Sequence, residues 1–67
     1  MSNFRERLFE EHAQIRERIF KLTEFTIRHE FNDLPEIDRH DLSEQLIYMK
    51  QYWGVLDRRV SRLCGDA

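Results

Sequence analysis

Arginine side chains gather near the two ends of this 67-residue chain, and they are the residues best suited to bind a ligand. Arg5 and Arg7 come early in the sequence, whereas Arg58, Arg59 and Arg62 come late. A guanidinium group binds phosphate through two parallel hydrogen bonds and stacks on aromatic rings and bases. If the fold brings the two ends together, these side chains are suited to a small phosphorylated or nucleotide ligand.

Aromatic side chains strengthen this prediction, because Phe4, Phe9 and Tyr52 fall close to the arginines in helical register. The alternative is a structural role, in which the late arginines stabilise the end of a helix through its dipole. All five arginines would then be solvated or paired with nearby carboxylates, namely Glu6, Glu10, Glu11 and Asp57. The charge pattern leaves both interpretations open.

Catalysis and metal binding find little support in the sequence. His12, His29 and His40, with the single thiol of Cys64, match no zinc-ligand spacing. One cysteine also excludes an intrachain disulfide. His12 is expected in a helix contact, and Cys64 has no activating histidine beside it. We therefore expect no metal site, no cofactor and no enzymatic activity.

Apolar periodicity predicts a first helix over residues 3–29, in which no Pro or Gly interrupts the pattern. Two apolar stripes run along it, which makes the apolar surface wider than one partner helix can cover. The main stripe contains Phe4, Leu8, Ile15, Ile19 and Leu22, with His12 or Glu11 filling its gap, and the second contains Phe9, Ala13, Phe20 and Ile27.

A second helix is expected over residues 35–63, with Pro35 in its first turn and a capping box formed by Asp33 and Glu36. Its apolar residues are spaced alternately four and three positions apart with no interruption, which indicates a heptad seam. The seam contains Leu42, Leu46, Met49, Trp53, Leu56, Val60 and Leu63, and a flanking stripe contains Gln45, Tyr48, Tyr52, Val55, Arg59 and Arg62.

Two long helices joined by a few residues must run antiparallel, so the predicted fold is all-α, a single helical hairpin domain over residues 1–67. A chain of this mass buries only roughly 60% of its surface even when ideally compact, which makes the monomer marginal. Small domains are usually stabilised by disulfides, by a metal or by oligomerisation. Since the sequence offers neither a disulfide nor a metal site, we expect a homo-oligomer. The expected interface residues are Phe9, Phe20, Ile27, Tyr48 and Val55.

The composition limits the kinds of partner that the chain can bind. The chain has 13 acidic and 11 basic residues, a net charge of −2, so it lacks the basic excess that binding to polymeric nucleic acid or an anionic membrane requires. No apolar run is long enough to span a membrane. The charged N-terminal segment is not a signal peptide, so we expect an intracellular, soluble protein.

Three segments carry a resemblance to a known group. They are F-R-E-R-L at residues 4–8, I-F-K-L-T-E-F at 19–25, and the run from Phe31 to Val60, which contains F-N-D-L-P and Q-L-I-Y-M-K-Q-Y-W-G-V-L-D-R-R. This pattern resembles the small helical-hairpin proteins of bacteriophages. The relatives of that class include the sponges of the anti-CBASS and anti-Thoeris groups, which counter bacterial cyclic-nucleotide defence.

The resemblance implies an oligomer, often hexameric, that sequesters cyclic dinucleotides, cyclic trinucleotides or cyclic ADP-ribose isomers in the cytoplasm of the infected host without cleaving them. It implies Arg58 and Arg62 as phosphate ligands and Tyr52 and Phe31 as stacking residues. Arg5 joins this set from the charge distribution.

A second hypothesis also fits the sequence. The stripe from Phe9 to Ile27 can dock onto a helix of a host or phage protein, which would make the chain a protein-interaction module.

Overall fold

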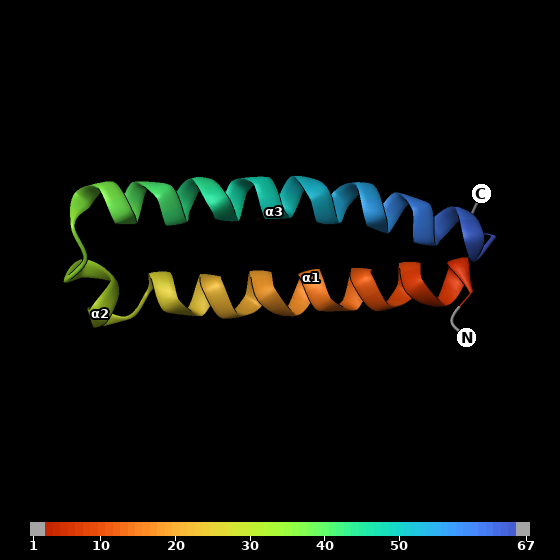
Figure 1. The fold of residues 1–67 in the computed structure, drawn as a ribbon, viewed down its shortest axis with the longest axis horizontal. Helices are drawn as coiled ribbons and strands as arrows, with labels where there is room; N and C mark the ends of the chain where they lie inside the picture. Colours follow the sequence, from red (N-terminus) through yellow and green to blue (C-terminus); the bar gives the residue numbers. More distant parts are fainter. Residues whose placement is uncertain (1–2, 66–67) are drawn as a thin grey trace.

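The computed structural model describes residues 3–65, which form three helices. They are α1 (Phe4–Thr26), α2 (His29–Asn32) and α3 (Glu36–Leu63). Helices α1 and α3 run antiparallel along each other, and the short α2 lies in the connection at one end (Figure 1). The all-α helical hairpin is therefore confirmed.

The first helix begins as its sequence requires but ends earlier than predicted. The side chain of Asn3 accepts the backbone N–H of Glu6 at 2.9 Å, which caps the helix. The prediction that this helix reaches residue 29 is wrong, because it stops at Thr26. There the Thr26 hydroxyl donates to the carbonyl of Thr23 at 2.7 Å, a bond that competes with helix continuation.

This early end lets the chain fold back on itself. Helix α2 brings Phe31 edge-on against Phe25, with ring centroids 6.0 Å apart and planes at 88°. A helix continued to residue 29 would carry Phe31 onward along the axis instead of back onto Phe25. The aromatic contact at the connection end therefore depends on the break after Thr26.

The predicted start of the second long helix is confirmed to within one residue, although its capping differs. The expected capping box is wrong: Asp33 follows α2, and its N–H donates to the carbonyl of Glu30. Pro35 occupies the N-cap position of α3, and its carbonyl accepts the N–H groups of Asp38 and Arg39. The fixed φ of proline sets the entry into the helix without any side-chain cap.

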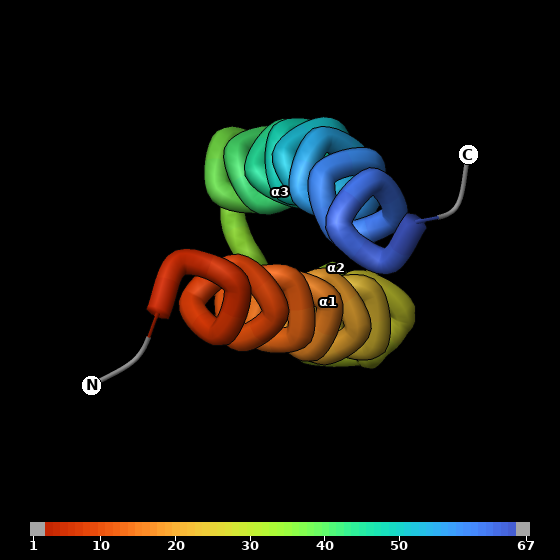
Figure 2. The backbone as a smooth tube through the Cα atoms, turned by 90° about the vertical axis from the view of Figure 1, so that its right-hand side faces the viewer, coloured from red at the N-terminus to blue at the C-terminus, as the bar shows by residue number. Residues whose placement is uncertain are grey.

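Only two side chains of the described residues are buried. Leu8 of α1 and Leu56 of α3 expose 4% and 0% of their surface. Both belong to the predicted apolar seams, whose other members are half-buried except for Phe4, which is 55% exposed. Seen end-on, the two helices lie side by side as two cylinders with no third layer (Figure 2). The core of the chain is thus one line of contact.

Much apolar surface remains in contact with solvent. The chain exposes 5525 Å², against about 4,600 Å² for a compact protein of its mass. All five residues predicted for an oligomer interface are exposed, and so are two that the sequence analysis omitted, Ile37 and Ile47. Among the described residues, no helix is long and apolar enough to cross a membrane. The monomer leaves two apolar stripes open.

Because the core is so thin, a single buried leucine should carry much of its stability. We expect Leu56→Ala to lower the free energy of unfolding by about 2–5 kcal/mol, since the void lies in the best-packed part of the seam. Urea denaturation at one fixed protein concentration measures this. Ile47→Ala, at a residue of α3 that is 55% exposed, is the control and should cost about 1 kcal/mol or less. Equal losses would contradict the burial pattern.

Candidate ligand-binding site

The antiparallel hairpin brings the beginning of α1 beside the end of α3, as the sequence analysis predicted (Figure 1). We call this the open end of the hairpin. Arg5 crosses it, and its Nη2 donates to the carbonyl of Leu63 at 3.4 Å. Carbonyls at a helix C-terminus lack partners within the helix, so this arginine satisfies one of them. Arg5 therefore helps to close the hairpin.

A groove on the open end combines cationic and aromatic side chains. The guanidinium of Arg59 lies over the ring of Phe4, with 5.4 Å between its central carbon and the ring centroid. Arg7, Leu8 and Glu11 complete the lining of this groove, whose volume is about 240 Å³. Ligand pockets usually measure about 300–1,000 Å³. The groove of one chain is thus smaller than a typical complete site.

Tyr52 borders the same region, since its hydroxyl donates to the carboxylate of Glu11. This hydrogen bond, with smaller contributions from desolvation and the negative charge of Glu11, raises the pKa of Tyr52 above its ordinary value, and Arg59 opposes the shift. Tyr52 as a whole remains 45% exposed. The phenol is thus held in place while part of its ring stays free to contact another molecule.

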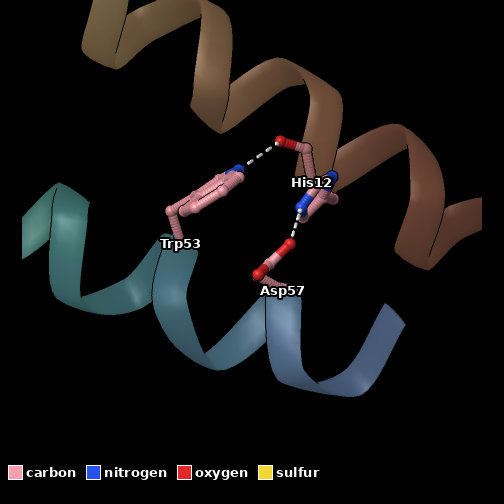
Figure 3. A network of polar contacts seen from close by, with 3 residues as sticks. All are labelled: His12, Trp53 and Asp57. Atoms are coloured by element: carbon pink, nitrogen blue, oxygen red, sulfur yellow. Dashed lines mark hydrogen bonds and ion pairs between the residues drawn. The ribbon is translucent and has the colours of Figure 1, made fainter. Parts of the chain in front are cut away.

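A second polar contact joins the helices near the middle of α1. His12 Nε2 lies 3.0 Å from Asp57 Oδ1, and the indole N–H of Trp53 donates to the backbone carbonyl of His12 at 3.2 Å (Figure 3). The rings of His12 and Trp53 stack with centroids 4.9 Å apart. The expectation that His12 is a hydrogen-bonded contact residue is confirmed. This network fixes the register of the two helices beside the open end.

The remaining predicted site residues divide between the two ends. Arg58 and Arg62 lie on α3 at the open end, where both are exposed. Phe31 lies on α2 at the opposite end of a molecule that measures 44 Å along its longest axis. Within one chain, Phe31 cannot join the arginines in a single site. Only contact between copies can bring them together.

The structure also bears on the alternative role of the arginines. Glu11 accepts the Tyr52 hydroxyl and Asp57 contacts His12. Among residues 3–65, no arginine nitrogen lies within 4.0 Å of a carboxylate at Glu6, Glu10, Glu11 or Asp57. The described part of the chain also holds no cluster of three or more side chains suited to a metal. The ion-pair part of the structural alternative is therefore contradicted among residues 3–65, whereas its solvated part agrees with the exposure of Arg58 and Arg62.

The sequence analysis placed Arg59 and Phe4 among the clustered arginines and aromatics, but it did not predict that these two side chains contact each other at the open end. The antiparallel seam contained the signal for this pair. Once Leu8 and Leu56 are taken as the buried partners of the two stripes, one helical turn back in α1 and one turn on in α3 lead to Phe4 and Arg59.

Comparison with protein families gives a match: the family model named Sequestin matches residues 2–62. The chain belongs to the Sequestin family. Neither a curated protein nor a solved structure matches it. The match covers α1, the connection and all of α3 except Leu63, so it includes the residues of the open-end groove as well as Phe31. The family name denotes sequestration, which agrees with the expectation of a protein that holds a ligand.

The contact between Tyr52 and Glu11 predicts a specific pH response. A raised pKa in the folded state means that this contact stabilises the fold fully below about pH 10 and is lost as pH rises through the folded-state pKa. In a Tyr48→Phe background, which leaves Tyr52 as the single tyrosine, Glu11→Gln should lower the midpoint of tyrosinate formation. Ultraviolet absorbance during a pH titration measures it.

Glu10→Gln is the matched control, because it removes an equal charge from the adjacent residue, which is exposed. It should leave the midpoint nearly unchanged. If the two variants shift the midpoint equally, the effect is one of net charge and the specific contact is absent.

Proposed function

We propose that this Sequestin-family chain is a bacteriophage sponge that sequesters cyclic-nucleotide immune signals in the cytoplasm of the infected bacterium. The ligand class is that of cyclic di- or trinucleotides and cyclic ADP-ribose isomers. The observation that carries the proposal is the open end, where Arg59 lies over Phe4 in a groove with Arg7. Such a combination of guanidinium groups and aromatic faces suits phosphates joined to bases.

The proposed site divides its work among several side chains. The exposed guanidinium groups of Arg58 and Arg62 hold phosphate oxygens, and Arg5 adds positive charge at the same end. The partly exposed ring of Tyr52 stacks on a base, with its position fixed by Glu11. Phe31 from a neighbouring copy supplies a second aromatic surface.

Binding in this scheme needs no chemical step. The groove of one chain is small and open to solvent, so a complete site forms only where copies meet. Sequestration requires high affinity and an excess of protein over signal, whereas catalysis would require groups placed around a scissile bond. Tight binding without cleavage is therefore the function that suits this arrangement.

The proposal is tested by isothermal titration with a panel of cyclic di- and trinucleotides and cyclic ADP-ribose isomers. Arg62→Ala should weaken binding of the ligand that the parent binds by roughly 10- to 100-fold, since it removes a charge-assisted hydrogen bond to phosphate. Lys50→Ala, in the exposed middle of α3, removes an equal charge and should bind as the parent does.

Two results would contradict parts of this proposal. The absence of binding by the parent across the panel at micromolar ligand would reject the ligand class. Unchanged affinity of an Arg62→Ala variant with the parent's solution mass would remove this residue from the site.

A second candidate function is supported by the other apolar stripe. Phe20 and Ile27 are 62% and 82% exposed, and Phe20 borders a groove with Ala13 and Arg16. This surface can receive an amphipathic helix of a host or phage protein. In that case the chain is a protein-interaction module.

Phe20→Glu separates the two functions, because a charge in the stripe should abolish capture of a partner from bacterial lysate while leaving the open end intact. Capture assays and titration of the cyclic-nucleotide panel with the same variant measure both outcomes. Loss of self-association without any captured partner would show that the stripe contacts other copies of this chain, which contradicts the interaction module.

A further inference from the structure

A row of side chains on α3, exposed except for the half-buried Arg59, has a spacing that reads the same in both directions. Successive members are four, three, four, three and four residues apart, so they lie on one face of the helix. Acidic and polar members come first, two tyrosines stand in the middle, and an arginine comes last. The row, which we call the α3 stripe, consists of Asp41, Gln45, Tyr48, Tyr52, Val55 and Arg59.

Each member of the first half has a counterpart at the same distance beyond position 50, and two of the three pairs are complementary. Asp41 corresponds to Arg59, an opposite charge, and Tyr48 corresponds to Tyr52, an aromatic pair. Gln45 corresponds to Val55. A two-fold axis through position 50 therefore places each member against its partner in a second, antiparallel copy. Parallel pairing would instead place Asp41 against Asp41 and Arg59 against Arg59.

We propose that two copies of this chain pair through the α3 stripe, antiparallel, about a two-fold axis near position 50. Tyr48 and Tyr52 of each copy form the centre of the contact. Asp41 of each copy pairs with Arg59 of the other at its two ends.

The charges of the whole helix favour the same orientation. Residues 36–44 of α3 contain four carboxylates and one arginine, whereas residues 45–63 contain four basic side chains and one carboxylate. Antiparallel copies place the acidic half of each helix against the basic half of the other. Position 50 also lies near the middle of α3, which spans Glu36–Leu63, so the two helices overlap along their full length.

Most of the stripe is open to a second copy, although the Tyr52 hydroxyl donates to Glu11 and Arg59 lies over Phe4, both on α1. Helix α1 lies along one side of α3 only (Figure 1), and Tyr48, Tyr52 and Val55 are 60%, 45% and 42% exposed. Asp41, Gln45 and Tyr48 border a groove with Glu44 and Met49. The two-fold axis directs Val55 and Tyr52 of the second copy toward this groove.

The amount of open surface also fits a second copy. The chain exposes 5525 Å², which exceeds the area of a compact protein of its mass by about 900 Å². A standard protein interface buries about 800 Å² on each partner. One additional interface of ordinary size therefore accounts for the excess.

Pairing of this kind also addresses the separation of the predicted site residues, an extension that rests on the proposed function. In an antiparallel pair, the connection end of one copy lies beside the open end of the other. Phe31 of one chain then approaches Arg62 of the other, and the dimer has two equivalent junctions. The site that one chain leaves incomplete is completed twice by symmetry.

The orientation is tested with a spin label on the exposed Cys64, the single cysteine of the chain. Cys64 lies 14 positions beyond position 50, so antiparallel pairing separates the two labels by about 42 Å at 1.5 Å per residue. Parallel pairing would bring them within about 20 Å, allowing for an interhelical distance of about 10 Å and the length of the labels. Pulsed dipolar spectroscopy of the ligand-free protein measures the distance. A short distance, or a monomer by sedimentation, overturns the proposal.

Charge exchange provides the second test. Asp41→Arg places arginine against Arg59 at both ends of the pair, and Arg59→Asp places aspartate against Asp41, so each variant should weaken association roughly tenfold or more. The double variant, Asp41→Arg with Arg59→Asp, restores opposite charges and should regain most of the parent's association. Sedimentation measures all three, and circular dichroism verifies their helices. A double variant no stronger than the single ones contradicts the antiparallel pairing.

The two proposals fail in distinguishable ways. A long label distance with no binding across the cyclic-nucleotide panel retains the pairing and rejects the sponge. Binding by a chain that remains monomeric rejects both the pairing and the junction site, and retains only a ligand site within one chain.

Discussion

A pair of helices can bury only one line of side chains, and this limit governs the whole molecule. Leu8 and Leu56 are the buried residues of the described chain, and the rest of the seam is only half-covered. A larger domain stabilises itself by enclosing side chains in several layers, which is unavailable at this size. The hairpin therefore keeps apolar surface in solvent on both long helices, where the same side chains that cannot be covered within one chain are able to contact another.

Polar contacts between the helices supplement the thin core, and they concentrate toward the open end. His12 joins Trp53 and Asp57, Glu11 joins Tyr52, and Arg5 reaches the last carbonyl of α3. Each contact fixes how one helix is rotated and shifted against the other, which a smooth apolar seam specifies weakly. The connection end relies instead on the edge-to-face contact of Phe25 and Phe31. The end that carries the arginines is thus the end whose geometry is best defined by directional bonds.

The sequence was sufficient for the parts of the fold that depend on periodicity. The step of four and three located α3 to within one residue and identified both seams, because burial along a helix repeats with the helical turn. It failed at the end of α1, because neither the hydrogen bond of the Thr26 hydroxyl nor the return of Phe31 onto Phe25 follows from the apolar period. The candidate site was only partly predictable for the same reason. Composition and antiparallel topology were enough to predict that the arginines lie together. The contacts of Tyr52 with Glu11 and of Arg59 with Phe4, however, depend on how the two helices are rotated against each other.

These constraints connect assembly to function in the proposed sponge. A site that forms only at a junction binds its ligand in the assembled state and not in the separate chains, so ligand and partner stabilise each other by mass action. The exposed tyrosines, costly in a free monomer, lose part of their contact with solvent where copies meet. The acidic half of α3 has a corresponding role. In the proposed pair, this acidic half lies against the basic half of a second copy and offsets the repulsion among arginines at the junction. Several guanidinium groups can therefore gather at one phosphate site, although the net charge of the chain is −2.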